Sequence, residues 1–131
     1  MTPEAARFLD KAQKLLAEAD VMIGVGLTDA AGRTAYLAAF HAAQALIFER
    51  IGRTLKSHTG VHAEFLRLTK DDSNIGELRA FLSRAYNLKA LADYETGPGS
   101  EISPDRATKA LADAKLFVAY LAALIERSGP K

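Results

Sequence analysis

Residues 36–48 constrain the fold of this chain more than any other segment, because only two of their side chains, His41 and Gln44, are strongly polar. A helix on the surface of a bundle has one apolar stripe, whereas a helix that is apolar nearly all round is surrounded by other elements. Its many alanines allow close helix approach. The segment therefore predicts a helix from about Thr28 to Arg50, either central in a bundle or buried in a dimer interface.

Four further segments have apolar residues at helical spacing. The first begins at Thr2, which can cap it, with Pro3 in the first turn. A short helix follows the polar hinge at residues 56–60, and a longer one spans about 75–92, where Asn74 and Glu77 resemble a capping box. The last starts at Ser103-Pro104 after a glycine- and proline-rich loop.

The length of 131 residues suits one domain, and no segment alternates with period two as a strand would. We therefore expect residues 1–131 to form a single all-α domain, a bundle of four to five helices.

The composition narrows the possible functions. There is no cysteine, which excludes disulfides and thiolate chemistry. Lysine and arginine number 17 against 16 acidic residues, a net charge of +1, so any contact with RNA has to be local or completed by a partner. No apolar run reaches the roughly 18 residues that a bilayer span needs, and the opening residues do not resemble a signal peptide. We expect a cytoplasmic protein without a membrane partner.

His58 and His62 are four residues apart and could share a helix face as metal ligands. The glutamate that follows the first histidine in the metalloprotease pattern is Thr59 here, and only Glu64 offers a third ligand. We expect neither a metal site nor a cofactor.

The hinge offers a second interpretation of His58, since Arg53 precedes it and Lys56 lies between. Metal-free RNA cleavage needs a histidine that exchanges a proton with the 2′-hydroxyl near neutral pH. It also needs a cation to stabilise the phosphoryl group. The alternative is that these are ordinary hinge residues and that His58 caps the following helix.

Asp93-Tyr94-Glu95 places two acids at a helix C-terminus, where they oppose the helix dipole. We expect Arg84 or a basic group from another helix to hold them. The alternative is a solvated helix end with Tyr94 packed half inside.

Taken in order, several segments resemble the small stand-alone HEPN proteins of bacteria and archaea. They are residues 33–46, Lys56-Ser57-His58-Thr59-Gly60-Val61, Ser83-Arg84-Ala85-Tyr86 and Ala92-Asp93-Tyr94. The resemblance implies an antiparallel bundle that forms a homodimer, often encoded beside a minimal nucleotidyltransferase as a toxin–antitoxin pair. Active members are metal-independent endoribonucleases with an Arg-x(4–6)-His motif, which Arg53 and His58 match. The tyrosine that typical toxins carry two places after the histidine is Gly60 here, so tyrosine nucleotidylation is not expected.

Two functional hypotheses follow. In the first, the chain is a toxin-like RNA-cleaving subunit with Arg53 and His58 catalytic and Lys56, Arg84, Asp93 and Tyr94 in contact with RNA. In the second, it is a non-catalytic module that binds a nucleotidyltransferase partner or a nucleotide. A purely structural role in a larger assembly remains a third possibility.

Overall fold

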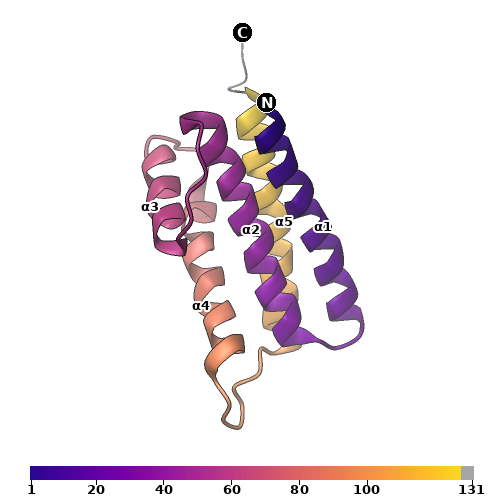
Figure 1. The fold of residues 1–131 in the computed structure, drawn as a ribbon. Coiled ribbons are helices and arrows are strands. Elements are labelled where there is room, and N and C mark those ends of the chain that lie inside the picture. Colours follow the sequence, from indigo (N-terminus) through magenta and orange to yellow (C-terminus); the bar gives the residue numbers. More distant parts are fainter. Residues whose placement is uncertain (128–131) are drawn as a thin grey trace.

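The computed structural model describes residues 1–127, which form five α-helices and one short 3₁₀ helix (Figure 1). The elements are α1 (Pro3–Gly24), α2 (Thr28–Ile51), α3 (His58–Leu68), η1 (Gly76–Ala80), α4 (Phe81–Tyr94) and α5 (Pro104–Arg127). The all-α bundle expected from the sequence is confirmed. In the described part of the chain, no helix combines the length and hydropathy that a membrane span requires.

Side-chain caps begin three of the helices. The Thr2 hydroxyl accepts a hydrogen bond from the Ala5 amide at 3.1 Å, and the Ser103 hydroxyl accepts one from the Arg106 amide at 3.2 Å. Both starts predicted from the sequence are thus confirmed. The cap of α3 is Ser57, whose hydroxyl accepts from the Gly60 amide at 2.9 Å, so the interpretation of His58 as the capping residue is wrong.

The fourth helical segment differs from its prediction. The Asn74 amide donates to the Asp72 carboxylate at 2.9 Å in a local turn, and η1 begins after Ile75 without a side-chain cap. The capping box expected there is absent. Gly76, the first residue of η1, has a φ of +59°, a left-handed conformation that glycine adopts without strain, and the regular turns of α4 begin at Phe81.

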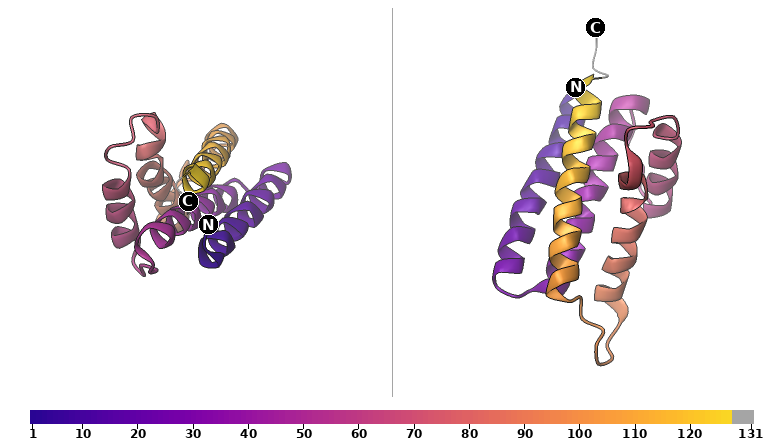
Figure 2. Two further views of the ribbon diagram at one scale, coloured as in Figure 1. Left: turned by 90° about the horizontal axis from the view of Figure 1, so that it is seen from above. Right: turned by 180° about the vertical axis from the view of Figure 1, so that it is seen from behind.

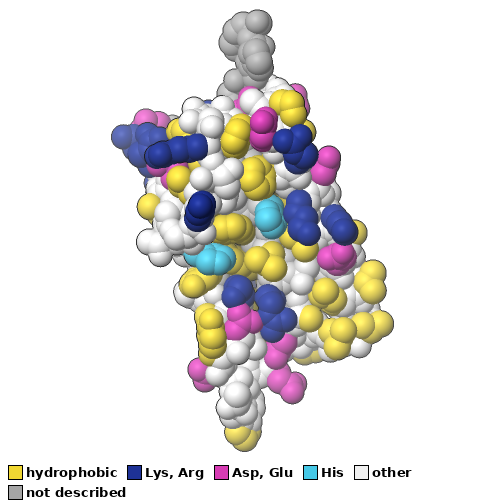
Figure 3. All heavy atoms as spheres, viewed as in Figure 1, with side chains coloured by type: hydrophobic (Ala, Val, Ile, Leu, Met, Phe, Trp, Pro, Cys, Tyr) yellow, Lys and Arg dark blue, Asp and Glu magenta, His cyan; other side chains and the backbone are white. Residues whose placement is uncertain are grey.

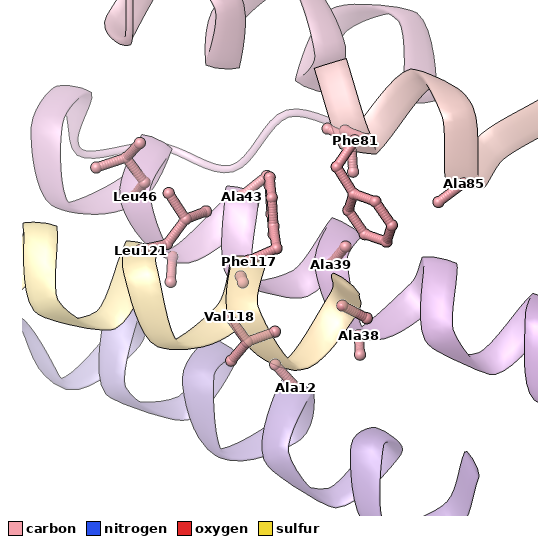
Figure 4. Close-up of a cluster of buried hydrophobic side chains, with 14 of the residues drawn as sticks. Ala12, Ala38, Ala39, Ala43, Leu46, Phe81, Ala85, Phe117, Val118 and Leu121 are labelled. Carbon is pink, nitrogen blue, oxygen red and sulfur yellow. The ribbon is translucent and has the colours of Figure 1, made fainter. Parts of the chain in front are cut away.

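Helix α2 is the centre of the bundle, as its apolar sequence predicts, because it packs against α1, α3, α4 and α5. Its alanines are fully buried along the central turns, and Figure 4 shows Ala38, Ala39 and Ala43 lying among Phe81, Phe117 and Val118 from neighbouring helices. Small side chains on α2 leave room for the large rings contributed by α4 and α5, which is how a central helix can have neighbours on several sides.

The two views in Figure 2 show that α3 and α4 lie together on one side of α2, while α1 lies on the other side and α5 behind. The chain begins and α5 ends at the same end of the bundle. The hinge before α3 brings the start of that helix against the middle of α2, and the candidate site lies at this junction of α2, α3 and α4.

Candidate functional site

The phenol oxygen of Tyr36 lies between two histidines. It is 2.7 Å from Nδ1 of His58 and 2.9 Å from Nε2 of His62. Tyr36 is fully buried on α2, while the histidines stand one turn apart at the start of α3 and are partly exposed. One buried hydroxyl therefore fixes both imidazole rings at the surface.

Aromatic rings surround this group. Phe40 lies 4.7 Å from the His58 ring, measured between centroids, and Tyr86 of α4 lies 5.3 Å from His58 and 5.5 Å from His62. Tyr86 also packs edge-on against Tyr36. The rings limit the orientations that the imidazoles can adopt and shield one side of them from water.

A cluster of charges borders the histidines. The Asp93 carboxylate, near the end of α4, accepts a hydrogen bond from Arg33 Nε of α2 at 2.6 Å and forms an ion pair with Lys89. Of the two ways in which we expected Asp93 to be held, the structure has the basic group from another helix. Lys89 and Arg33 hold the pKa of Asp93 below its ordinary value, through hydrogen bonds first and charge second.

Both histidines of the site favour the neutral form. Burial lowers the pKa of His58, and the positive charge of Lys89 lowers it further. Burial also lowers the pKa of His62, with a smaller contribution from His58. A neutral imidazole near neutral pH has a lone pair with which it can accept a proton.

Arg53 and Lys56 lie exposed in the hinge between α2 and α3. The pKa of Glu64 on α3 is lowered mainly by the hydrogen bond from Arg67, and the charge of Arg53 adds a smaller contribution. No hydrogen bond or ion pair joins Arg53 to His58 within residues 1–127. The pairing of these two residues in one catalytic group stays a prediction.

Arg84 and Tyr94, two further residues predicted to contact RNA, lie apart from the histidines. Arg84 stands over the Phe81 ring and lines a hollow between α4 and α5 with Lys109 and Asp113. Tyr94 is 75% exposed, so the alternative of a half-packed ring is wrong. Of the predicted residues, His58 contacts the Tyr36 hydroxyl, and Asp93 binds Arg33 and Lys89 in the neighbouring charge cluster.

A second hollow, of about 400 Å³, lies across α2 from the histidines. Arg7, Phe8, Lys11 and His41 line it, together with Glu4 and Thr54. Phe8 stacks on His41 with their ring planes 25° apart. Figure 3 shows histidine side chains on the same face of the molecule as the hinge, with lysine and arginine side chains around them.

The sequence did not reveal the roles of Tyr36 and Lys89. Tyr36 stands in an apolar run, and nothing in its local sequence pairs it with the two histidines of the later helix. For His62, the sequence indicates only a possible metal ligand. Within residues 1–127 no three His, Cys, Asp or Glu side chains gather as a metal would require.

The fold and this group define a class: a small all-α bundle with a histidine pair at the junction of three helices. Residues 5–124 match the HEPN domain, and the chain belongs to this family. It is 39% identical over 114 residues to a UPF0332 protein of Archaeoglobus fulgidus, an alignment that covers 82% of this chain and 84% of that protein.

The crystal structure of TT1696 from Thermus thermophilus has the same fold, with a TM-score of 0.77. The superposition covers 93% of this chain and 98% of that one at 20% sequence identity. This similarity concerns the fold alone. The resemblance noted in the sequence is thus confirmed at the level of family and architecture.

Proposed function

We propose that this chain is the toxin-like subunit of a nucleotidyltransferase/HEPN pair in the cytoplasm and that it cleaves RNA without a metal ion. The observation that carries this proposal is the pair of histidines held by the Tyr36 hydroxyl. Burial and the nearby charge of Lys89 lower the pKa of His58, which favours its neutral form. Neutral imidazole and a neighbouring cation are the two groups that RNA cleavage by transesterification requires.

In this reaction, His58 takes the proton of a 2′-hydroxyl as that oxygen attacks the adjacent phosphorus. The bond between phosphorus and the 5′-oxygen breaks, and the protonated His58 gives its proton to this leaving oxygen. A cation stabilises the negative charge on the phosphoryl oxygens during the attack. Two lysines of the same chain could supply this cation. Lys56 lies two residues before His58 in the sequence, and the charge of Lys89, after burial, contributes to the lowered pKa of His58.

Arg53 enters this scheme through a homodimer. Because its side chain is exposed in the segment before α3, we propose that it meets His58 of a second copy across a cleft between two such segments. This arrangement makes cleavage depend on the dimer and not on the isolated subunit.

The test is cleavage of a labelled structured RNA by purified protein in EDTA, with His58→Ala and Arg53→Ala alongside. The expected result is cleavage by the wild type and a loss of about a hundredfold or more in both variants, in line with the ~10²–10⁴-fold typical of acid–base groups. Tyr120→Phe, which changes a phenol bonded to Asp72, is the control and retains activity. No cleavage at high protein concentration, or equal cleavage by all proteins, rejects the catalytic proposal.

The net charge of +1 favours a second candidate, a non-catalytic module that binds a minimal nucleotidyltransferase or a nucleotide. Co-expression with such a transferase, followed by size-exclusion chromatography, tests the first form, and calorimetry with nucleotides tests the second. Two results together support this candidate over the first. The wild type and the His58→Ala variant form equally stable complexes with the transferase, which elute at the same volume, and the wild type does not cleave RNA.

A further inference from the structure

We infer that Tyr36 couples His58 and His62 into a single acid–base unit that holds one exchangeable proton, with His62 as the positioning residue that stores it. The inference deepens the proposed function of His58 and rests on it where RNA is concerned. The coupling itself rests only on the shared hydroxyl and is measured without RNA.

The number of hydrogen bonds that the Tyr36 hydroxyl can donate and accept limits how the two histidines can bind it. A phenol has one proton to donate, and its oxygen also accepts. Both histidine nitrogens lie within hydrogen-bond distance of this oxygen, at 2.7 and 2.9 Å. Both contacts are satisfied only when Tyr36 donates to one histidine and accepts an N–H from the other.

This rule fixes the tautomers of the two neutral rings. His58 presents Nδ1 to the phenol, whereas His62 presents Nε2. If Tyr36 donates to His58, His58 carries its proton on Nε2, and His62 donates from Nε2. If the direction reverses, both rings carry their proton on Nδ1. The two histidines must therefore have the same tautomer, and they change it together.

The same capacity limits the charge of the pair. One protonated ring can donate to the Tyr36 oxygen while the hydroxyl donates to the other, neutral ring. With both rings protonated, two N–H groups point at one oxygen and the buried hydroxyl loses its acceptor, which is costly. The pair thus takes up its second proton only at a much lower pH than its first.

The surrounding groups agree with this limit. Tyr86 and Lys89 face the pair from α4, and the positive charge of Lys89 lowers the pKa of His58. Asp93 compensates that charge only in part, because it is shared with Arg33 of α2. Burial raises the pKa of Tyr36 well above its ordinary value, so the phenol stays neutral throughout.

A proton can move through this unit without leaving a charge on Tyr36. When Nε2 of His58 accepts a proton, the Nδ1 proton of His58 passes to the Tyr36 oxygen, and the Tyr36 hydroxyl proton passes to Nε2 of His62. One N–H and one O–H bond break, and one O–H and one N–H bond form. The positive charge moves from His58 to His62, and the reverse movement returns the proton to a leaving oxygen.

The experiment is ¹⁵N NMR of the histidine rings of the wild-type chain between neutral and acidic pH. The shifts of Nδ1 and Nε2 report the tautomer of each neutral ring. The expected result is equal tautomer fractions for His58 and His62, and a first titration step in which both rings change together while one proton is taken up. Opposite tautomers in the two rings, or two independent one-proton curves, overturn the inference.

Tyr36→Phe keeps the ring and removes only the hydroxyl. In this variant the tautomer fractions of His58 and His62 should become unequal, because each ring then follows its own surroundings. Tyr86→Phe is the matched control, since this ring packs on the same histidines at similar distances, and equal fractions should persist. If Tyr36→Phe does not fold, the wild-type tautomers alone decide.

The outcome of the NMR experiment is separate from the outcome of the RNA assay. Coupled histidines without cleavage reject the proposed function and keep the coupled unit. Cleavage of RNA by a protein whose histidines titrate independently supports the proposed function and rejects the coupled unit. If the histidines are coupled and RNA is cleaved, Tyr36→Phe and His62→Gln should change the shape of the pH–rate profile as well as the maximal rate.

Discussion

At the scale of single residues, Asp93 joins parts of the chain that lie 60 positions apart, since its carboxylate accepts from Arg33 and pairs with Lys89. The side chains are partly exposed, with 18% of Asp93 and 38% of Arg33 accessible to water. Water therefore weakens the attraction, and the cluster positions α4 against α2 more than it stabilises the fold.

Asp93→Asn should lower the free energy of unfolding near neutral pH by up to about 1 kcal/mol. Because the folded state lowers the pKa of Asp93, the stabilisation is present above the ordinary pKa of about 4 and is lost as pH falls through the folded value. Urea unfolding of both proteins near neutrality and below that pKa measures this. Asp10→Asn, at an exposed site on α1, is the control, and a difference that persists at low pH would contradict the prediction.

The histidines predict a second pH dependence. The pKa values of His41, His58 and His62 are all lowered, with burial as the largest cause. Just below the ordinary pKa of about 6.5 the unfolded chain binds more protons than the folded one, so the stability should fall as pH drops through this region. The urea midpoint at slightly alkaline and mildly acidic pH measures it. His62→Gln should show a shallower fall, and a flat or rising profile in the wild type would refute this explanation.

At the scale of elements, α2 decides the architecture because its buried face is built largely of alanine. Ala38, Ala39, Ala42, Ala43 and Ala45 are all inaccessible to water. A small residue at each contact lets four neighbouring helices approach one axis, and larger side chains there would push them apart.

Ala39→Leu should therefore destabilise the fold by about 1–3 kcal/mol or more, through overpacking. Ala17→Leu introduces the same side chain at an exposed position of α1 and should change the stability by less than about 0.5 kcal/mol. Urea denaturation of both variants gives the comparison. Similar stabilities for the two variants would show that the core around Ala39 can accommodate a leucine side chain, and would contradict the prediction.

The helices could be predicted from the sequence because their signals are local. Thr2-Pro3 and Ser103-Pro104 start helices through their own side chains, and the apolar run of α2 indicates its burial. The start of η1 could not be predicted, because the positive φ of Gly76 and the turn at Asp72 depend on how the chain packs there.

The site was predicted less completely than the fold. His58 and Asp93 stood out because a histidine in a hinge and an acid at a helix C-terminus are unusual locally. Tyr36 and Arg33 did not stand out, because their partners His58 and Asp93 lie 22 and 60 positions away in the sequence. Lys89 did not stand out either, because its pairing with Asp93 one helix turn later is an ordinary helical spacing. Contacts of that range depend on how α2, α3 and α4 are placed.

At the scale of the whole molecule, the net charge of +1 means that any RNA has to be bound by local groups of cations. The face seen in Figure 3 has lysine and arginine side chains around its histidines, and Arg7 and Lys11 line the hollow beside α1. On helix α5, in front in the rear view of Figure 2, Lys109 forms an ion pair with Asp113. If RNA binds, as in the proposed function, it should follow the first face and contact few phosphates.

This predicts how salt affects binding. The slope of log K against log[salt] for single-stranded RNA should be shallow, and Arg7→Gln with Lys11→Gln should reduce it by roughly 0.7 for each phosphate that the variant no longer neutralises. Lys109→Gln, whose ammonium is already paired on α5, should leave the slope unchanged. Fluorescence anisotropy with labelled RNA at low and moderate KCl concentrations gives the three slopes. Equal slopes in all proteins would show that RNA does not contact Arg7 and Lys11 of α1. A change of slope in Lys109→Gln alone would show that RNA binds at α5.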